Sequence, residues 1–151
     1  MYRNILVPID GSDTATAGLH EAIKLAMSQG ARIRLIHVID EVAALSPHVY
    51  GLMPPNLLEH MRANGESIVA SARERIHAAG LAVETRIVET IGACAGDYIV
   101  EAAKEWPADI IVCGTHGRRG LRRMVLGSDA ESIVRMSPVP ILLVRATGSE
   151  T

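Results

Sequence analysis

The fold is decided near the start of the chain, where residues 5–13 read ILVPIDGSD. The run 5–9 is continuously apolar, with a proline near its end, which is typical of a strand buried on both faces of a parallel sheet. Gly11 and Ser12 then provide a turn and a helix N-cap. The apolar residues that follow recur at helical spacing as far as Gly30: Ala15, Leu19, Ala22, Ile23 and Ala26. This stretch predicts a strand, a tight turn and a helix.

The same unit recurs along the chain. Further strands are predicted at 32–39, 82–89, 109–113 and 141–144, and further helices at 61–79, 95–105 and 129–136. Because parallel neighbouring strands need helical crossovers, this alternation predicts an α/β fold. We expect a doubly wound five-stranded parallel sheet, Rossmann-like, of order 3-2-1-4-5 with helices on both faces. Residues 41–56 contain three prolines and predict a long connection, of the kind that often forms a binding loop.

Length and composition restrict the class of protein. The 151 residues suit one domain, which we place at 1–146, followed by a flexible tail at 147–151. A net charge of −2 argues against a nucleic-acid or membrane-surface binder, which would carry a basic excess. Two cysteines make no disulfide framework, and we find neither a signal peptide nor an apolar run of about 20 residues. These features predict a cytoplasmic protein that binds neither nucleic acid nor membranes.

A glycine-rich loop follows the predicted strand 109–113. Residues 114–128 read GTHGRRGLRRMVLGS, which is the pattern G-x-x-G, nine residues, G-S. Glycines let the backbone approach a polyphosphate and expose N–H donors to it, and the helix that opens at Gly127-Ser128 adds its positive end. Ser128 and Glu131 have capping-box spacing, so we expect Ser128 to be the N-cap as well as a phosphate ligand. The loop predicts phosphate binding; a purely structural glycine loop is the alternative.

The position of this loop in the fold supports a ligand site. In open α/β sheets, ligands bind at the carboxyl ends of the strands where the strand order reverses. If the first and fourth strands are neighbours, residues 8–12 and 114–128 face each other there. Asp10 then either contacts the ligand or only forms an Asx turn with Gly11 and Ser12.

These segments also carry a family resemblance over nearly the whole chain. The chain resembles the universal stress protein family in residues 5–12, in His37-Val38 at the end of the second strand, and in residues 138–144, which read PVPILLV. Gly114, Gly117 and Gly127-Ser128 complete the match. This glycine pattern resembles that of the branch of the family that binds ATP.

The resemblance implies an ATP-binding, stress-responsive sensor, with Mg²⁺ or Mn²⁺ carried mainly by the phosphates and no metal held by the protein alone. It places Asp10 near the ribose and phosphates, and the main chain of Val38 at the adenine. The full set of implied nucleotide-binding residues is Pro8, Asp10, Val38, Cys113, Gly114, Gly117, Gly127, Ser128 and Asp129. Asp129 departs from the family, in which an apolar residue is common here. A carboxylate beside a triphosphate repels it unless the carboxylate points away or meets a cation.

Other chemistries lack their residues in this sequence. There is no Walker A lysine, no G-x-G-x-x-G after the first strand and no acidic cluster of a receiver domain. We find no nucleophile paired with a base, so we expect no catalysis. Two alternatives stay open: slow ATP hydrolysis with Asp10 and a phosphate-bound Mg²⁺, and a structural stress dimer without nucleotide.

The remaining polar residues have structural explanations. The six histidines show no close pair at metal-ligand spacing, and only His116 lies in the candidate site. We expect exposed helix surface at His20, His60 and His77. A solvated loop with one or two phosphate contacts is expected at Arg118, Arg119, Arg122 and Arg123. Cys113 is expected to be a small buried residue rather than a reactive thiol.

The two edge strands differ in whether they carry charged residues, which discourage an exposed strand edge from pairing with another chain. Charged residues lie in and around the strand 82–89, at Glu84, Arg86 and Glu89. The final strand is apolar from Val139 to Val144 apart from Pro140. An unguarded edge pairs readily with another copy, so we predict a homodimer through Val139 to Val144 about a two-fold axis. Stress proteins that this chain resembles pair at the same strand.

Overall fold

The computed structural model describes residues 1–41, 56–116 and 126–146. Within them strands and helices alternate, in the order β1 (Asn4–Pro8), α1 (Asp13–Gln29), β2 (Arg32–Asp40), α3 (Leu57–Ala78), β3 (Val83–Thr90), α4 (Ala95–Glu105), β4 (Ile110–Gly114), α5 (Ser128–Met136) and β5 (Ile141–Val144). The described strands form a parallel five-stranded sheet of order β3-β2-β1-β4-β5, as predicted. In these parts of the chain no helix has the length and apolar character needed to cross a membrane.

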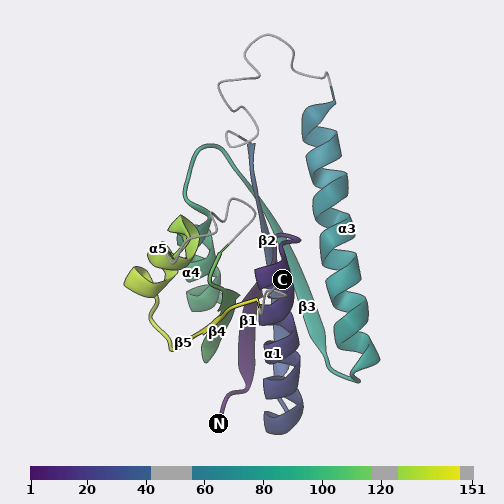
Figure 1. The fold of residues 1–151 in the computed structure, drawn as a ribbon, viewed down its shortest axis with the longest axis vertical. Helices are drawn as coiled ribbons and strands as arrows, with labels where there is room; N and C mark the ends of the chain where they lie inside the picture. The colour runs from purple at the N-terminus through teal and green to yellow at the C-terminus, as the bar shows by residue number, and fades with distance from the viewer. Residues whose placement is uncertain (42–55, 117–125, 147–151) are drawn as a thin grey trace, which may run out of the picture.

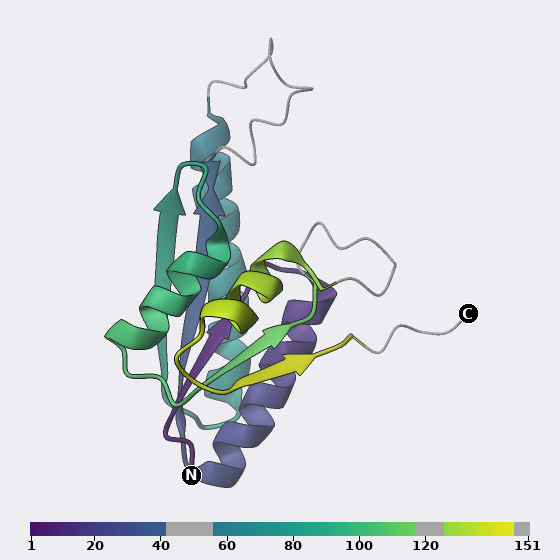
Figure 2. The ribbon, with the colours of Figure 1, turned by 90° about the vertical axis from the view of Figure 1, so that its left-hand side faces the viewer.

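Helices cover both faces of the sheet, which confirms the doubly wound architecture (Figure 1). One core cluster joins α1 and α3 to the strand residues Ile5, Val7 and Leu35. The other joins α4 and α5 to Leu6 and the residues that share its face. Successive strand residues point to opposite faces, so one apolar strand fills both cores. Figure 2 shows α4 and α5 on the face turned toward the viewer.

The turn that links β1 to α1 forms as its sequence predicts. Ser12 has extended backbone angles and its hydroxyl accepts a hydrogen bond from the Ala15 N–H at 3.2 Å. Gly11 has φ +82°, a left-handed conformation that favours glycine. At the far end, Gly30 ends α1 in the left-handed region. These local signals fix where α1 begins and ends, and so where its first turn meets the sheet.

Polar contacts hold together the end of the sheet at which the strands begin. The Asp109 carboxylate accepts the N–H groups of Arg3 and Asn4 at 2.7 and 2.9 Å, and these two bonds lower the pKa of Asp109. The indole of Trp106 donates to Glu84 at 3.2 Å. This end of the sheet is therefore occupied by structural hydrogen bonds, and the opposite end carries the candidate site.

Candidate functional site

The exit of β1 and the exit of β4 lie side by side, because these two strands pair directly at the centre of the sheet. This is the point at which the strand order reverses, as predicted. Asp10 leaves β1 here, and its Oδ1 accepts the Ser12 N–H at 2.9 Å. The Asx turn, one of the two alternatives for Asp10, is thus formed, and it holds the half-buried carboxylate at the reversal point.

A chain of hydroxyl groups ties the first turn of α1 to the residues after β4. The Ser12 and Thr14 hydroxyl oxygens are 3.2 Å apart, and the Thr14 hydroxyl donates to the main-chain carbonyl of His116. Gly114 makes the approach possible, since a Cβ there would lie 2.7 Å from the Thr14 carbonyl carbon and 2.9 Å from the Ala15 nitrogen. The first turn of α1, which follows the loop 8–12, is therefore in contact with residues 114–116 at the start of the glycine-rich loop.

The two ends of the glycine-rich loop are joined by main-chain hydrogen bonds. The Gly127 N–H donates to the Thr115 carbonyl at 3.0 Å, and the Thr115 N–H donates to the Val144 carbonyl at 2.9 Å. Gly114 and Gly127 are thereby brought to one edge of the sheet. The other predicted loop residues, Gly117 and the four arginines at 118, 119, 122 and 123, lie outside the described residues, as does most of the connection 41–56.

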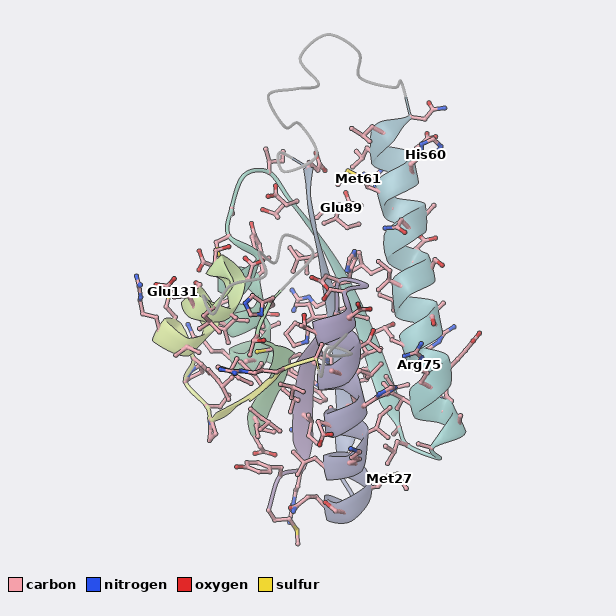
Figure 3. All side chains as sticks on the ribbon, viewed as in Figure 1. Met27, His60, Met61, Arg75, Glu89 and Glu131 are labelled. Atoms are coloured by element: carbon pink, nitrogen blue, oxygen red, sulfur yellow. The ribbon has the colours of Figure 1, made fainter. Side chains whose placement is uncertain are left out.

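The prediction that Ser128 caps α5 is wrong. Gly127 is the N-cap and Ser128 is the first helical residue. The Glu131 N–H, which a capping box would direct to the serine hydroxyl, donates instead to the Gly127 carbonyl at 2.8 Å. The Glu131 side chain pairs with Arg135 at 2.8 Å, and Figure 3 shows it on the outer side of α5. No side chain of the described residues caps this helix, so none of them uses the donor capacity of its first-turn N–H groups.

Asp129 turns its carboxylate toward α4. The thiol of Cys94, at the N-cap position of α4, donates to Asp129 Oδ1 with an S···O distance of 3.3 Å. Gly96 lets the two helix starts approach, because a Cβ there would lie 2.8 Å from the Asp129 carbonyl oxygen. Cys94 is a residue that sequence reasoning missed, since no spacing pattern links it to Asp129. The contact directs the Asp129 side chain toward the Cys94 thiol of the same chain.

His116 carries a polar atom that no described residue satisfies. Its Nδ1 lies 3.0 Å from the Thr115 hydroxyl, while its Nε2 is buried and has no hydrogen-bond partner within the described part of the chain. A buried polar atom without a partner is uncommon, because leaving it unsatisfied costs about 1–3 kcal/mol. His116 therefore carries a buried ring nitrogen whose hydrogen-bonding capacity no described residue uses.

Cys113 packs as a small apolar residue. It belongs to the core cluster beneath α4 and α5 and is 4% exposed. Burial raises the pKa of its thiol to about 11. The expectation of a small buried residue is confirmed. The remaining predicted residues at this edge, Pro8 and Val38, are half-buried in β1 and β2. Val38 is followed by two more residues of β2, so it lies within the strand rather than after it.

A separate cleft of about 250 Å³ opens between α1 and α3. It is lined mainly by the two helices, including Leu19 and Arg75, and it touches the exit of β1 only at Ile9 and Gly11. Figure 3 labels Arg75 on α3, on the side of the molecule away from α5. This cleft therefore opens on the α1/α3 side of the sheet and reaches the exit of β1 at the two residues that flank Asp10. Among the described residues no group of three or more histidine, cysteine or acidic side chains is placed to hold a metal ion.

Comparison with known proteins identifies the family. The sequence model of the Universal stress protein family matches residues 1–145. The chain belongs to the universal stress protein family. It is 31% identical to Universal stress protein MJ0531 of Methanocaldococcus jannaschii over 99% of this chain and 86% of that protein. It is 32% identical to Universal stress protein YxiE of Bacillus subtilis over 96% of this chain and 100% of that protein.

Solved structures of related sequence share the fold. The hypothetical protein MJ0577 superposes with a TM-score of 0.82 at 28% identity, covering 99% of each chain. A universal stress protein solved in complex with cAMP superposes with a TM-score of 0.67 at 27% identity, covering 97% of this chain and 98% of the other. The Rossmann-like universal stress protein fold is therefore shared along the whole sheet.

Proposed function

We propose that this universal stress protein binds ATP at the edge where β1 and β4 end, and acts as a nucleotide-dependent regulator of a stress response. The observation that carries the proposal is the first turn of α5, which no described side chain caps and which begins beside the joined ends of the glycine-rich loop. A helix N-terminus with unpaired N–H groups attracts phosphate through hydrogen bonds and through the helix dipole. A related stress protein of the same fold has been solved with cAMP, which supports an adenine nucleotide as the ligand class.

We take the individual nucleotide-binding residues from the family resemblance. We assign contact with the ribose and phosphates to Asp10, and contact with the adenine to the main chain of Val38. Pro8, Cys113 and Gly114 lie alongside the nucleotide in this assignment. We assign phosphate binding to Gly117, Gly127, Ser128 and the main chain of Asp129. The Cys94 thiol, by holding the Asp129 carboxylate, reduces the repulsion that this acid would exert on phosphates. We infer that Mg²⁺ or Mn²⁺ arrives with ATP and is coordinated mainly by its phosphates.

The exposed edge of β5 suits a homodimer. Leu142 and Leu143 are 39% and 36% exposed, and the neighbouring α5 exposes Val134 and Met136. Apolar side chains on an unpaired strand edge favour association with a second copy, in which the same patch meets itself. We infer that Val139 to Val144 forms the dimer contact.

Nucleotide extraction tests the proposed ligand. Purified protein is denatured with heat and acid, and the released small molecules are separated by chromatography. We expect an adenine nucleotide from the wild type and little from Gly127→Val. Gly127 has φ −62° and ψ 152°, which valine also adopts, so this substitution obstructs phosphate approach without straining the backbone. Gly120→Val is the matched control outside the glycine pattern, and loss of nucleotide from both variants would contradict the assignment.

A further inference from the structure

The hydrogen-bond ladder between β1 and β2 stops one bond earlier than its register allows. The last paired residues are Pro8 and Ile36, and the Ile9 N–H still donates to the Ile36 carbonyl at 2.9 Å. In a parallel ladder the next bond runs from the N–H of Val38 to the carbonyl of Ile9. The pairing does not extend to that rung, although both residues are described.

The carbonyl of Ile9 is occupied by a side chain instead. The Nδ1 of His37 lies 2.8 Å from this oxygen, and because a carbonyl only accepts, Nδ1 carries the proton. His37 is 5% exposed. It has room because α3 has a glycine opposite: a Cβ on Gly65 would lie 2.8 Å from the His37 Cδ2 and 3.0 Å from its Nε2. The imidazole is thus held between the end of β1 and α3.

The main chain of Val38 is left facing the candidate site. Alternate residues of a strand direct their N–H and C=O groups to the same side, and the Ile36 carbonyl bonds to β1. The N–H and C=O of Val38 therefore point toward β1, beyond the last residue of that strand. A donor beside an acceptor matches the edge of adenine, which offers the N1 acceptor and the N6 amino donor.

We propose that His37 is a positioning residue of the nucleotide site: by occupying the Ile9 carbonyl, it keeps the Val38 amide unpaired for the base. This rests on the ATP-binding function proposed above. His37 itself does not touch the nucleotide, because its imidazole faces α3. Without the imidazole donor, the Val38 N–H closes onto the Ile9 carbonyl and completes the ladder.

The test compares wild type, His37→Leu and His37→Asn, with amide exchange followed by NMR in nucleotide-free protein and ATP affinity by calorimetry. Leucine fills the space without a donor, whereas asparagine places an amide N–H near the position of Nδ1. We expect the Val38 amide of the leucine variant to exchange at least about tenfold more slowly, and its ATP affinity to fall about five- to tenfold, the effect of one hydrogen bond. The asparagine variant should restore both values toward the wild type.

Gly65→Ala is the second perturbation, and it applies if the leucine variant does not fold. Its Cβ pushes the imidazole from the α3 side and should produce the same two changes. The inference is overturned if the variant tested, His37→Leu or Gly65→Ala, leaves the Val38 exchange rate unchanged. It is also overturned if the wild type binds ATP and the variant binds ATP equally tightly. A wild type that binds no ATP contradicts the proposed function, and this inference with it.

Discussion

The hydroxyl of Thr14 donates to the main-chain carbonyl of His116, 102 residues further along the chain. This bond joins the first turn of α1 to the start of the glycine-rich loop. One side-chain hydrogen bond therefore links the two segments between which we propose that the nucleotide binds.

Thr14→Val should weaken ATP binding by about three- to tenfold, because it removes this bond while keeping the shape of the side chain. The free energy of unfolding should fall by about 1 kcal/mol. Calorimetry and urea denaturation measure the two effects. Thr14→Ser keeps the hydroxyl and serves as the control; a serine variant as weak as the valine variant would show that the methyl group matters instead.

The two cysteines should differ in reactivity. The pKa of Cys113 is raised to about 11 by burial, which disfavours the thiolate, so its reactive form is scarce until the pH approaches that value. Cys94 is only partly buried. In folded protein at pH 8 we expect iodoacetamide to modify Cys94 alone, as read by mass spectrometry of peptides. Alkylation of Cys113 at the same rate as Cys94 would contradict its placement in the core; both should react in urea.

If the protein forms a homodimer through β5, charged substitutions in that strand should weaken the dimer. Lysine at Leu142 and Leu143 together should dissociate the dimer or make the chain insoluble, because both side chains lie on the exposed edge. Light scattering after size exclusion measures the particle mass. A wild type of 16.2 kDa across micromolar concentrations would rule the dimer out.

Hydrolysis of bound ATP should be slow or undetectable. One carboxylate oxygen of Asp10 already accepts the Ser12 N–H, which suits contact with ribose or metal better than activation of water. Phosphate release under saturating ATP and Mg²⁺ measures the rate. A turnover above about 1 per second, the low end of ordinary enzyme rates, would show that the protein is a catalyst.

The sequence predicts the fold well because its signals are local. Apolar runs, helical spacing and glycine stops define each element, and Ser12 caps α1 as its position predicts. The prediction fails at Ser128, where the same type of signal is present. There the Gly127 carbonyl takes the Glu131 N–H and Arg135 takes its carboxylate, two competing partners that a capping-box pattern does not weigh.

Parts of the candidate site could not be predicted because they depend on distant partners. The contact of Cys94 with Asp129 joins residues 35 positions apart and requires α4 and α5 to start side by side. The bond from His37 to Ile9 spans 28 positions and depends on the register of two strands. Sequence spacing identifies the residue types at the edge, whereas the register decides which main-chain groups are left unpaired.

Isothermal titration of the wild-type protein with ATP and Mg²⁺ tests the central claim most directly. The protein is first stripped of any nucleotide, and adenosine and GTP are titrated under the same conditions. We expect saturable heat with ATP. Adenosine should bind more weakly because it lacks the phosphates that we assign to α5 and the glycine-rich loop, and GTP should bind more weakly because we assign the Val38 main chain to adenine. No heat at millimolar ATP would contradict the central claim.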